Sequence, residues 1–544
     1  MDLPVPPSAH LSPVPLNPDE GATQFALPSH GRLARAASLM AIATVASRIL
    51  GLVREIVAAW LFGATQAKAA YVIAYYLPFF VQRLLLGGTL SIVFIPTLSR
   101  YLARNDLQEA RRVSGSLFSL VFAMGAGMVA AGYVLAPLLV PIAAPGFTAS
   151  AELVSLTVHL TRIIFVAMLF LALAVFLTGF LQAHNDFTVA ALAPVAFNIT
   201  IIAGTLVLGP RIGIEGLAIA WIAGTAMQFL VQLPAARRYG LRPGPIDVRH
   251  PAVRDFGRLA VPAVLALAIL EINAYVGRFF ASLLAASPAA SPVAVLDYAY
   301  EVVQAPAGIF AVSIATAVFP LLSRHAASGS HADLRTTASL ALRTVLFVIL
   351  PLTALVVVLR VPLVALIFQR GQFTPQATEA VAAALLGYAV GLPAIAGSYV
   401  VTRTYYALQD MGTPVRIGGV MVVLNALLAS ALMRPWGVGG IALAASIVSV
   451  MNVGLLLWGL RQRLGRIDGR QIASSLLRSG VASLIAGAAG AAVVALVRPH
   501  GLVGHSLQVG AALGAGGVAY LGACYLLRVN ELHTTWRLLR RPAR

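Results

Sequence analysis

The sequence predicts an all-α integral membrane protein with fourteen transmembrane helices. Its 544 residues are 59% hydrophobic and only 10% charged, whereas soluble domains carry about 25% charged residues. Unbroken apolar runs such as Leu117–Val140 and Ile163–Leu181 reach the length of about 20 residues that crosses a bilayer as a helix. An outer-membrane barrel would show short alternating segments instead, so the sequence favours a helix bundle.

Apolar runs bounded by polar turns define the fourteen predicted spans in order. Residues 1–31, with seven prolines and no apolar run, are expected to form a disordered tail. The spans follow at 37–62, 69–98, 114–140, 153–182, 188–208, 214–234, 259–285, 294–322, 337–368, 377–408, 414–433, 438–459, 476–497 and 503–527.

The basic residues support this count. The loops and tails on one side of the predicted membrane contain 25 of the 38 lysines and arginines, and the other side contains five, including Lys68. Because Lys and Arg accumulate in cytoplasmic loops, this asymmetry predicts that both termini are cytoplasmic. It also accounts for the net charge of +19 without nucleic acid as a partner.

The chain resembles itself at a shift of about 225 residues. "FIPTLSR" at 94–100 recurs as "VFPLLSR" at 318–324, and "GIEGLAIA" at 213–220 recurs as "GVGGIALA" at 437–444. Six spans separate the copies, so the two halves keep the same orientation in the membrane and should enclose a cleft. The predicted parts are the tail 1–31, an N-lobe at 32–240, a C-lobe at 241–465, and two extra C-terminal helices with a basic tail at 466–544.

Ionisable residues within spans mark pathways because they are costly there. Arg48, Arg54 and Arg83 form the only cluster of cations deep in the first half, and guanidinium groups bind phosphate oxygens in a two-pronged fashion. We therefore predict a polyanion site, such as one for pyrophosphate. The alternative is that these arginines pair with Glu55 and with helix-end carbonyls. In the second half, Arg278 is expected to pair with Glu301.

No catalytic motif occurs. The sequence lacks a P-loop, HExxH and GxSxG, each of which carries a specific chemistry. We expect a protein that is not an enzyme, with no metal site and no cofactor, and in which Cys524 is a small apolar helix residue.

Several segments resemble the MurJ/MviN lipid II flippase family. They are "ASRILGLVREIVAAWLFGA" at 46–64, "LPFFVQRLLLGGTLSIVFIPTLSRY" at 77–101, "APGF" at 144–147, "LQAHNDF" at 181–187, "FQRGQFT" at 368–374 and "YYALQDMGTPV" at 405–415. The resemblance implies a MATE-like fold in the bacterial inner membrane and alternating access. The implied substrate is lipid II, the undecaprenyl-pyrophosphate-linked peptidoglycan precursor, for cell wall synthesis. The last two spans would form a groove for its lipid tail.

The resemblance also assigns roles to single residues, and this chain departs from several of them. Arg48 and Arg54 match the family's arginines of span 1, whereas its arginine pair of span 2 is Gln82–Arg83 here. Ala69 stands where an acidic residue is common, and Tyr300–Glu301 where the family has Asp–Arg. Some members bind sodium through carboxylates of spans 7, 11 and 12; span 11 offers Asn425 but no acid, which leaves the coupling ion open.

Other functions remain open from the sequence alone. A flippase for another polyprenyl-linked glycan would share all these features, while a MATE-like antiporter for cationic drugs should present acids in its cavity. A membrane glycosyltransferase would need acidic residues near one membrane face, and a scaffold would not need arginines deep in the membrane.

Overall fold

A computed structural model describes residues 30–86, 94–251, 272–273, 275–287, 289–465, 468–497, 499 and 501–532, without the side chains of 30–39, 41 and 81–86. The predicted tail up to residue 29, most of the predicted seventh span and the Arg83 side chain lie outside this description. Within it the chain is helical and contains no strand.

The first group of helices follows the predicted spans 1–6. It consists of α1 (His30–Phe62), α2 (Gln66–Leu86), the short α3 (Ile95–Ala103), α4 (Leu107–Ala143), α5 (Ala151–Ala183), α6 (Phe187–Ile212) and α7 (Ile214–Arg238).

The second group begins with helical residues 275–282, the described part of span 7. It continues with α9 (Pro292–Pro306), the π-helical turn η3 (Ala307–Ala311), α10 (Val312–Ala327), α11 (His331–Phe368), α12 (Pro375–Ala407), α13 (Gly412–Leu464), α14 (Gly469–Leu496) and α15 (Gly501–Leu526).

Fourteen crossings are confirmed by this arrangement. Ten helices in the described part are long and apolar enough to cross a membrane. One of them, α13, contains two spans that meet at Gly437, where the backbone leaves the helical region. Another continues from α9 through η3 into α10. The remaining three crossings are α1, α2 and the helix that includes residues 275–282.

The internal repeat is visible in the backbone. Gly213, which begins α7, and Gly437, inside α13, both have a positive φ, +65° and +54°. Three residues later, Gly216 lies against the backbone of Leu208, and Gly440 lies against the carbonyl of Leu432. All three spacings equal the shift of 224 read from the sequence. Further pairs of positive-φ residues recur at 224–225 residues: Asn105 and Gly329, Asn185 and Gln409, Gly240 and Gly465.

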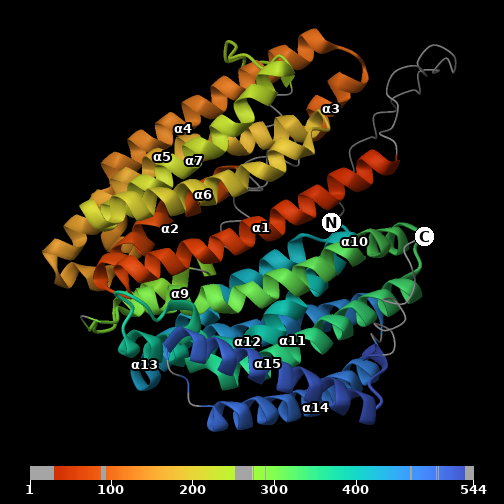
Figure 1. Ribbon diagram of the computed structural model, residues 1–544. Helices are drawn as coiled ribbons and strands as arrows, with labels where there is room; N and C mark the ends of the chain where they lie inside the picture. Colours follow the sequence, from red (N-terminus) through yellow and green to blue (C-terminus); the bar gives the residue numbers. More distant parts are fainter. Residues whose placement is uncertain are drawn as a thin grey trace, which may run out of the picture.

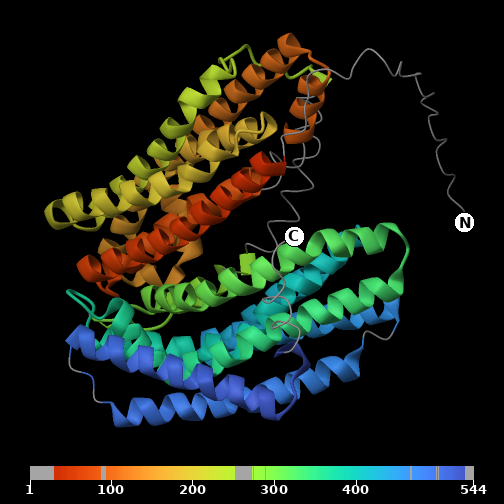
Figure 2. The same cartoon turned by 45° about the vertical axis from the view of Figure 1, so that its right-hand side comes forward.

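The helices form two lobes, which Figures 1 and 2 show from two directions. The N-lobe contains α1–α7 and the C-lobe contains α9–α13, with α14 and α15 packed on α11. In both views the lobes converge where α1 ends and diverge toward the end that carries α3 and α10. We call these the closed end and the splayed end.

Hydrogen bonds join the lobes at the closed end. Tyr298 donates its hydroxyl to the carbonyl of Gly63 (3.1 Å), and Ser291 N–H donates to the carbonyl of Ala64 (2.7 Å). Two more run from Gln372 N–H to the carbonyl of Trp60 (2.9 Å) and from Gly146 N–H to Ser282 Oγ (3.2 Å). Across the described residues, every hydrogen bond between the lobes lies at this end.

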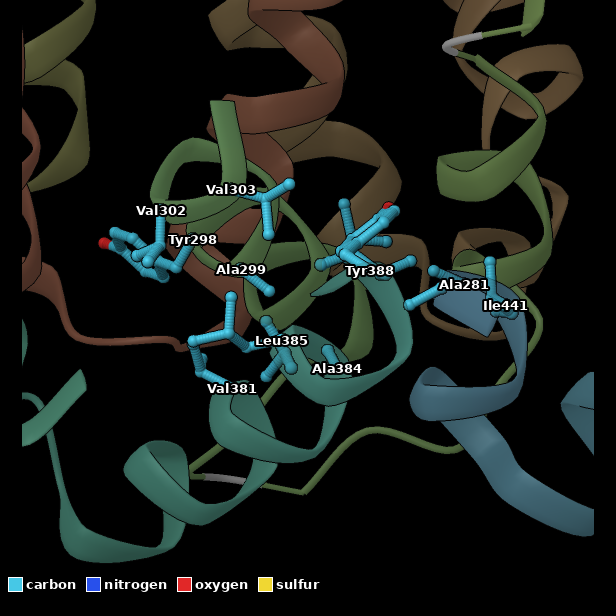
Figure 3. Packing of buried hydrophobic residues seen from close by; sticks show 14 of the residues in the cluster. Ala281, Tyr298, Ala299, Val302, Val303, Val381, Ala384, Leu385, Tyr388 and Ile441 are labelled. Carbon is cyan, nitrogen blue, oxygen red and sulfur yellow. The ribbon is translucent and has the colours of Figure 1, made fainter. Parts of the chain in front are cut away.

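The largest apolar cluster lies behind these bonds. In Figure 3, Tyr298, Ala299, Val302 and Val303 of α9 face Val381, Ala384 and Leu385 of α12. Tyr298 is fully buried there and packs on Phe368 and Phe373. Closely packed side chains deform little and tend to switch between a few distinct packing arrangements. The cluster should therefore keep α9 fixed against α12 at the closed end.

Candidate functional site

Glu55 lies at the centre of a buried ion network in the N-lobe. Its Oε1 accepts hydrogen bonds from Arg54 Nε (3.2 Å) and Nη2 (3.0 Å), and its Oε2 accepts one from Lys68 Nζ (3.0 Å). Only 11% of the Glu55 side chain is exposed. The carboxylate therefore neutralises two cations at once, which a buried charge requires.

Lys68 also belongs to this network. The apolar runs of the sequence place it in a loop, and this prediction is wrong. It lies in the first turn of α2, and 1% of its surface is exposed. Its ammonium group stands over the ring of Tyr71 in the same helix and over the ring of Tyr298 in the other lobe, 5.4 and 4.9 Å from the centroids. Lys68 thus connects the charged network to the residue that closes the lobes.

Arg54 is fixed from a second side by α6 and α7. Its Nη1 donates to Asn198 Oδ1 at 3.5 Å, and its guanidinium lies over the ring of Trp221, 5.0 Å from the centroid. Asn198 in turn donates to the carbonyl and hydroxyl oxygens of Ser47 on α1. The alternative that Arg54 pairs with Glu55 is what the structure contains, and 16% of the Arg54 side chain remains exposed.

Arg48 lies in a different environment from Arg54. It is exposed, and its guanidinium lies against Gly308 of the C-lobe, in the space that a side chain at that position would fill. Gly308 belongs to the π-helical turn η3, and such turns are frequent at functional sites. Arg48 is therefore a cation between the lobes, next to the π-helical turn that joins α9 to α10.

The C-lobe contributes a second buried pair, with a different partner from the expected one. Arg278 donates to Asp297 Oδ1 at 3.0 Å, and its guanidinium lies 3.4 Å from the centroid of the Tyr76 ring of α2. No ion pair joins Arg278 to Glu301 in the described part of the chain. The expected pairing of Arg278 with Glu301 is thus corrected to Asp297, one helical turn earlier on α9.

Glu301 faces the charges of the other lobe. Among the described residues, Glu55, Asp297, Arg54 and Lys68 lie close enough to act on it electrostatically. The three carboxylates Glu55, Asp297 and Glu301 balance the three cations Arg54, Lys68 and Arg278. Among the described residues, Arg48 is a further cation that lies outside these six charges.

A polar cavity of about 290 Å³ lies within the C-lobe. Asn425 donates to Asn273 Oδ1 at 2.8 Å, while its own Oδ1 is buried and has no hydrogen-bond partner among the described residues. The lining includes Arg278, Tyr300, Gln304, Tyr388, Ser398, Tyr399, Ser449 and Asn452. The polar groups of the wall are amides, hydroxyls and one guanidinium, which pairs with Asp297.

Comparison with known proteins points to one family over most of the chain. The family model described as "Lipid II flippase MurJ" matches residues 58–511. A relative from Vibrio cholerae, named "Probable lipid II flippase MurJ", is 30% identical over 442 residues, which cover 79% of this chain and 83% of the relative.

Two solved structures share the fold. A "Lipid II flippase MurJ, inward closed conformation" superposes with a TM-score of 0.75 at 24% identity, over 92% of this chain and all of that one. An inward-facing transporter of the multidrug resistance MATE family superposes with a TM-score of 0.64 at 15% identity, over 78% of this chain and 96% of that one. The MATE-like architecture expected from the sequence is confirmed.

Proposed function

The chain belongs to the lipid II flippase MurJ family, and we propose that it moves lipid II from the cytoplasmic to the periplasmic leaflet of the bacterial inner membrane. The observation that carries this proposal is the family match over residues 58–511, combined with two like-oriented lobes. The chain acts as a transporter and forms no covalent bond with its cargo.

The arrangement of the lobes supports an orientation in which the splayed end faces the cytoplasm. The splayed end carries the loops rich in arginine, such as 100–112 and 237–249, and basic loops face the cytoplasm. With both termini cytoplasmic, the space between the lobes would receive lipid II from the inner leaflet. Rocking of the lobes about the closed end would then expose the same space to the periplasm.

The arginines of α1 suit the pyrophosphate of lipid II. Arg48 is exposed, and its guanidinium lies against Gly308 of the other lobe. Arg54 is oriented by Glu55, Asn198 and Trp221, so its guanidinium loses little freedom on binding. We propose that Arg48, Arg54 and Arg83 bind the pyrophosphate, while α14 and α15 provide the groove for the lipid tail.

The test is complementation of a bacterium depleted of its own lipid II flippase. Arg54→Ala should abolish complementation, because it removes a guanidinium of the proposed pyrophosphate site. The protein level should stay normal, because Glu55 keeps its ion pair with Lys68. Arg54→Lys should retain part of the activity, since lysine keeps the charge and loses the two-pronged geometry. Arg403→Ala, which removes a guanidinium packed on Phe319 in the C-lobe, is the matched control.

The same strain separates the alternatives. If full-length wild-type protein restores growth and lowers accumulated lipid II, the proposed substrate stands. Failure of wild type, together with accumulation of another polyprenyl-linked glycan in its native host after depletion, would favour a flippase for that glycan. Full complementation by Arg54→Ala would refute the role of Arg54 in binding, but it would leave the proposed substrate untouched.

A further inference from the structure

A second polar cavity lies away from the space between the lobes. It has a volume of about 680 Å³ and lies between α11, the start of α14 and the chain that follows α15. Its wall consists of Arg343, Asp468, Gly469, Arg470, Gln471, Ser474, Ser475, Arg478, Val529, Asn530 and Glu531. Nothing in the proposed flipping mechanism uses it.

The charges of this wall favour an anion. Arg343 pairs with Glu531 at 3.2 Å, so these two charges cancel. Arg478 donates one hydrogen bond to the carbonyl of Arg528 (3.1 Å). Arg470 makes no ion pair within the described chain. Against these two guanidinium groups stands one further carboxylate, Asp468, which leaves the wall with net positive charge.

The start of α14 adds to this positive charge. The helix has 28 residues and begins at Gly469, which lines the cavity. The N–H groups of Gln471 and Ile472 already donate to the carbonyl of Asp468. The first turn therefore offers an anion the N–H groups of Gly469 and Arg470 and the positive end of the helix dipole.

A buried hydroxyl in the wall also has no partner. Ser475 is 7% exposed, and its Oγ makes no hydrogen bond to any residue that the structure describes. Buried polar groups are nearly always hydrogen-bonded, so this hydroxyl is an unsatisfied donor in the wall of the cavity.

The surroundings point to a lipid as the source of the anion. Leu477 and Leu484 of α14, which are seven residues apart and therefore share one face of the helix, are each 72% exposed. Acyl chains can lie on this face while a headgroup enters the cavity. The rest of the chain, residues 533–544, contains four arginines and no Asp or Glu, so its side chains offer no anion.

We propose that this cavity binds the phosphate of an anionic phospholipid of the cytoplasmic leaflet, with Arg470, Arg478 and the first turn of α14 as its ligands. Basic pockets between transmembrane helices on this side of a membrane bind acidic headgroups in the same manner. The bound lipid would hold α14 and the chain after α15 against α11.

The proposal can be tested by lipid binding to purified full-length protein, measured by native mass spectrometry. The probes are phosphatidylglycerol, phosphatidylcholine and inorganic phosphate. The site variant is Arg470→Ala with Arg478→Ala. The control variant is Arg324→Ala with Arg416→Ala, which removes two exposed arginines of the same face outside the cavity. Since all four side chains are exposed, both variants should fold.

We expect wild type to prefer phosphatidylglycerol over phosphatidylcholine. The site variant should bind phosphatidylglycerol at least about tenfold more weakly, because it loses two charge-assisted contacts, and the control should keep wild-type affinity. Equal loss in both variants, or retained affinity in the site variant, would overturn the assignment. Binding of inorganic phosphate without a preference for phosphatidylglycerol would overturn the lipid as its source.

Discussion

Replacing Glu55 with glutamine should reveal how much the N-lobe depends on its buried ion network. The carboxylate is the shared acceptor of Arg54 and Lys68, at 3.0 Å from each. Glutamine has nearly the same shape but no charge, so Glu55→Gln leaves both cations in place without their counter-ion. Removing one partner of a buried ion pair costs about 3–5 kcal/mol, and we expect a loss of this size.

Most of that loss should come from Lys68. Its side chain is 2% exposed, against 16% for Arg54, and Arg54 keeps its contacts with Asn198 and Trp221. Adding Lys68→Met removes the more deeply buried cation. The double variant should therefore recover at least half of the stability that Glu55→Gln loses, with a coupling of about 0.5–3 kcal/mol between the two sites.

The assay is unfolding of the purified protein in mixed micelles with increasing denaturing detergent, followed by circular dichroism. Wild type, both single variants and the double variant form a thermodynamic cycle. The reasoning would be refuted if Glu55→Gln unfolded at the wild-type midpoint, or if the double variant were no more stable than Glu55→Gln.

Three further predictions concern the closed end, the contact of Arg48 with Gly308, and one of the loops. Tyr298→Phe removes the hydroxyl that binds the Gly63 carbonyl; a hydrogen bond contributes about 0.5–1.5 kcal/mol, so the lobes should separate at this end roughly two- to tenfold more often, measured as faster labelling of a cysteine introduced at Ala64 above the low background of buried Cys524. Gly308→Val should block flipping at normal abundance, because its side chain would take the place of the Arg48 guanidinium; Gly454→Val, where no atom lies nearby, is the control for the complementation assay. Burial raises the pKa of Asp410, but its hydrogen bonds from Thr413 and the charge of Arg463 outweigh this effect and hold the pKa below its usual range; the stability from this carboxylate should be complete above about pH 4, fall as the pH drops through its lowered pKa, and be missing at every pH in Asp410→Asn, as an acid titration of unfolding midpoints would show.

The membrane makes this fold readable from the sequence. Each span must be long, apolar and helical, because backbone groups find no water in a bilayer, and the arginines of the loops then set its register. The repeat at 224 residues was visible as two short motifs, and the structure repeats their geometry at Gly213 and Gly437.

The partners of charged residues were harder to predict. Asp297 and Glu301 lie four residues apart on α9, so they share one face of the helix and differ mainly in depth. Spacing alone cannot choose between them, and Arg278 contacts Asp297. Lys68 was counted as a loop residue because it precedes an apolar run. Glu55 is the sequence feature that could have indicated the position of Lys68. An acid within a span needs a cation nearby, and Lys68 is a second candidate besides the adjacent Arg54.

The closed end is bonded chiefly through peptide groups of the segment 60–64. The carbonyls of Trp60, Gly63 and Ala64 accept bonds from the C-lobe, and no side-chain replacement in the segment removes a carbonyl. Sequence drift at Trp60 or Ala64 can therefore proceed without loss of the acceptors. Gly63 is the exception, because its φ of +58° and the nearby carbonyl of Gln372 leave no place for a side chain. A molecule that wedged these lobes apart by competing for the peptide groups would leave the protein few single substitutions through which to escape.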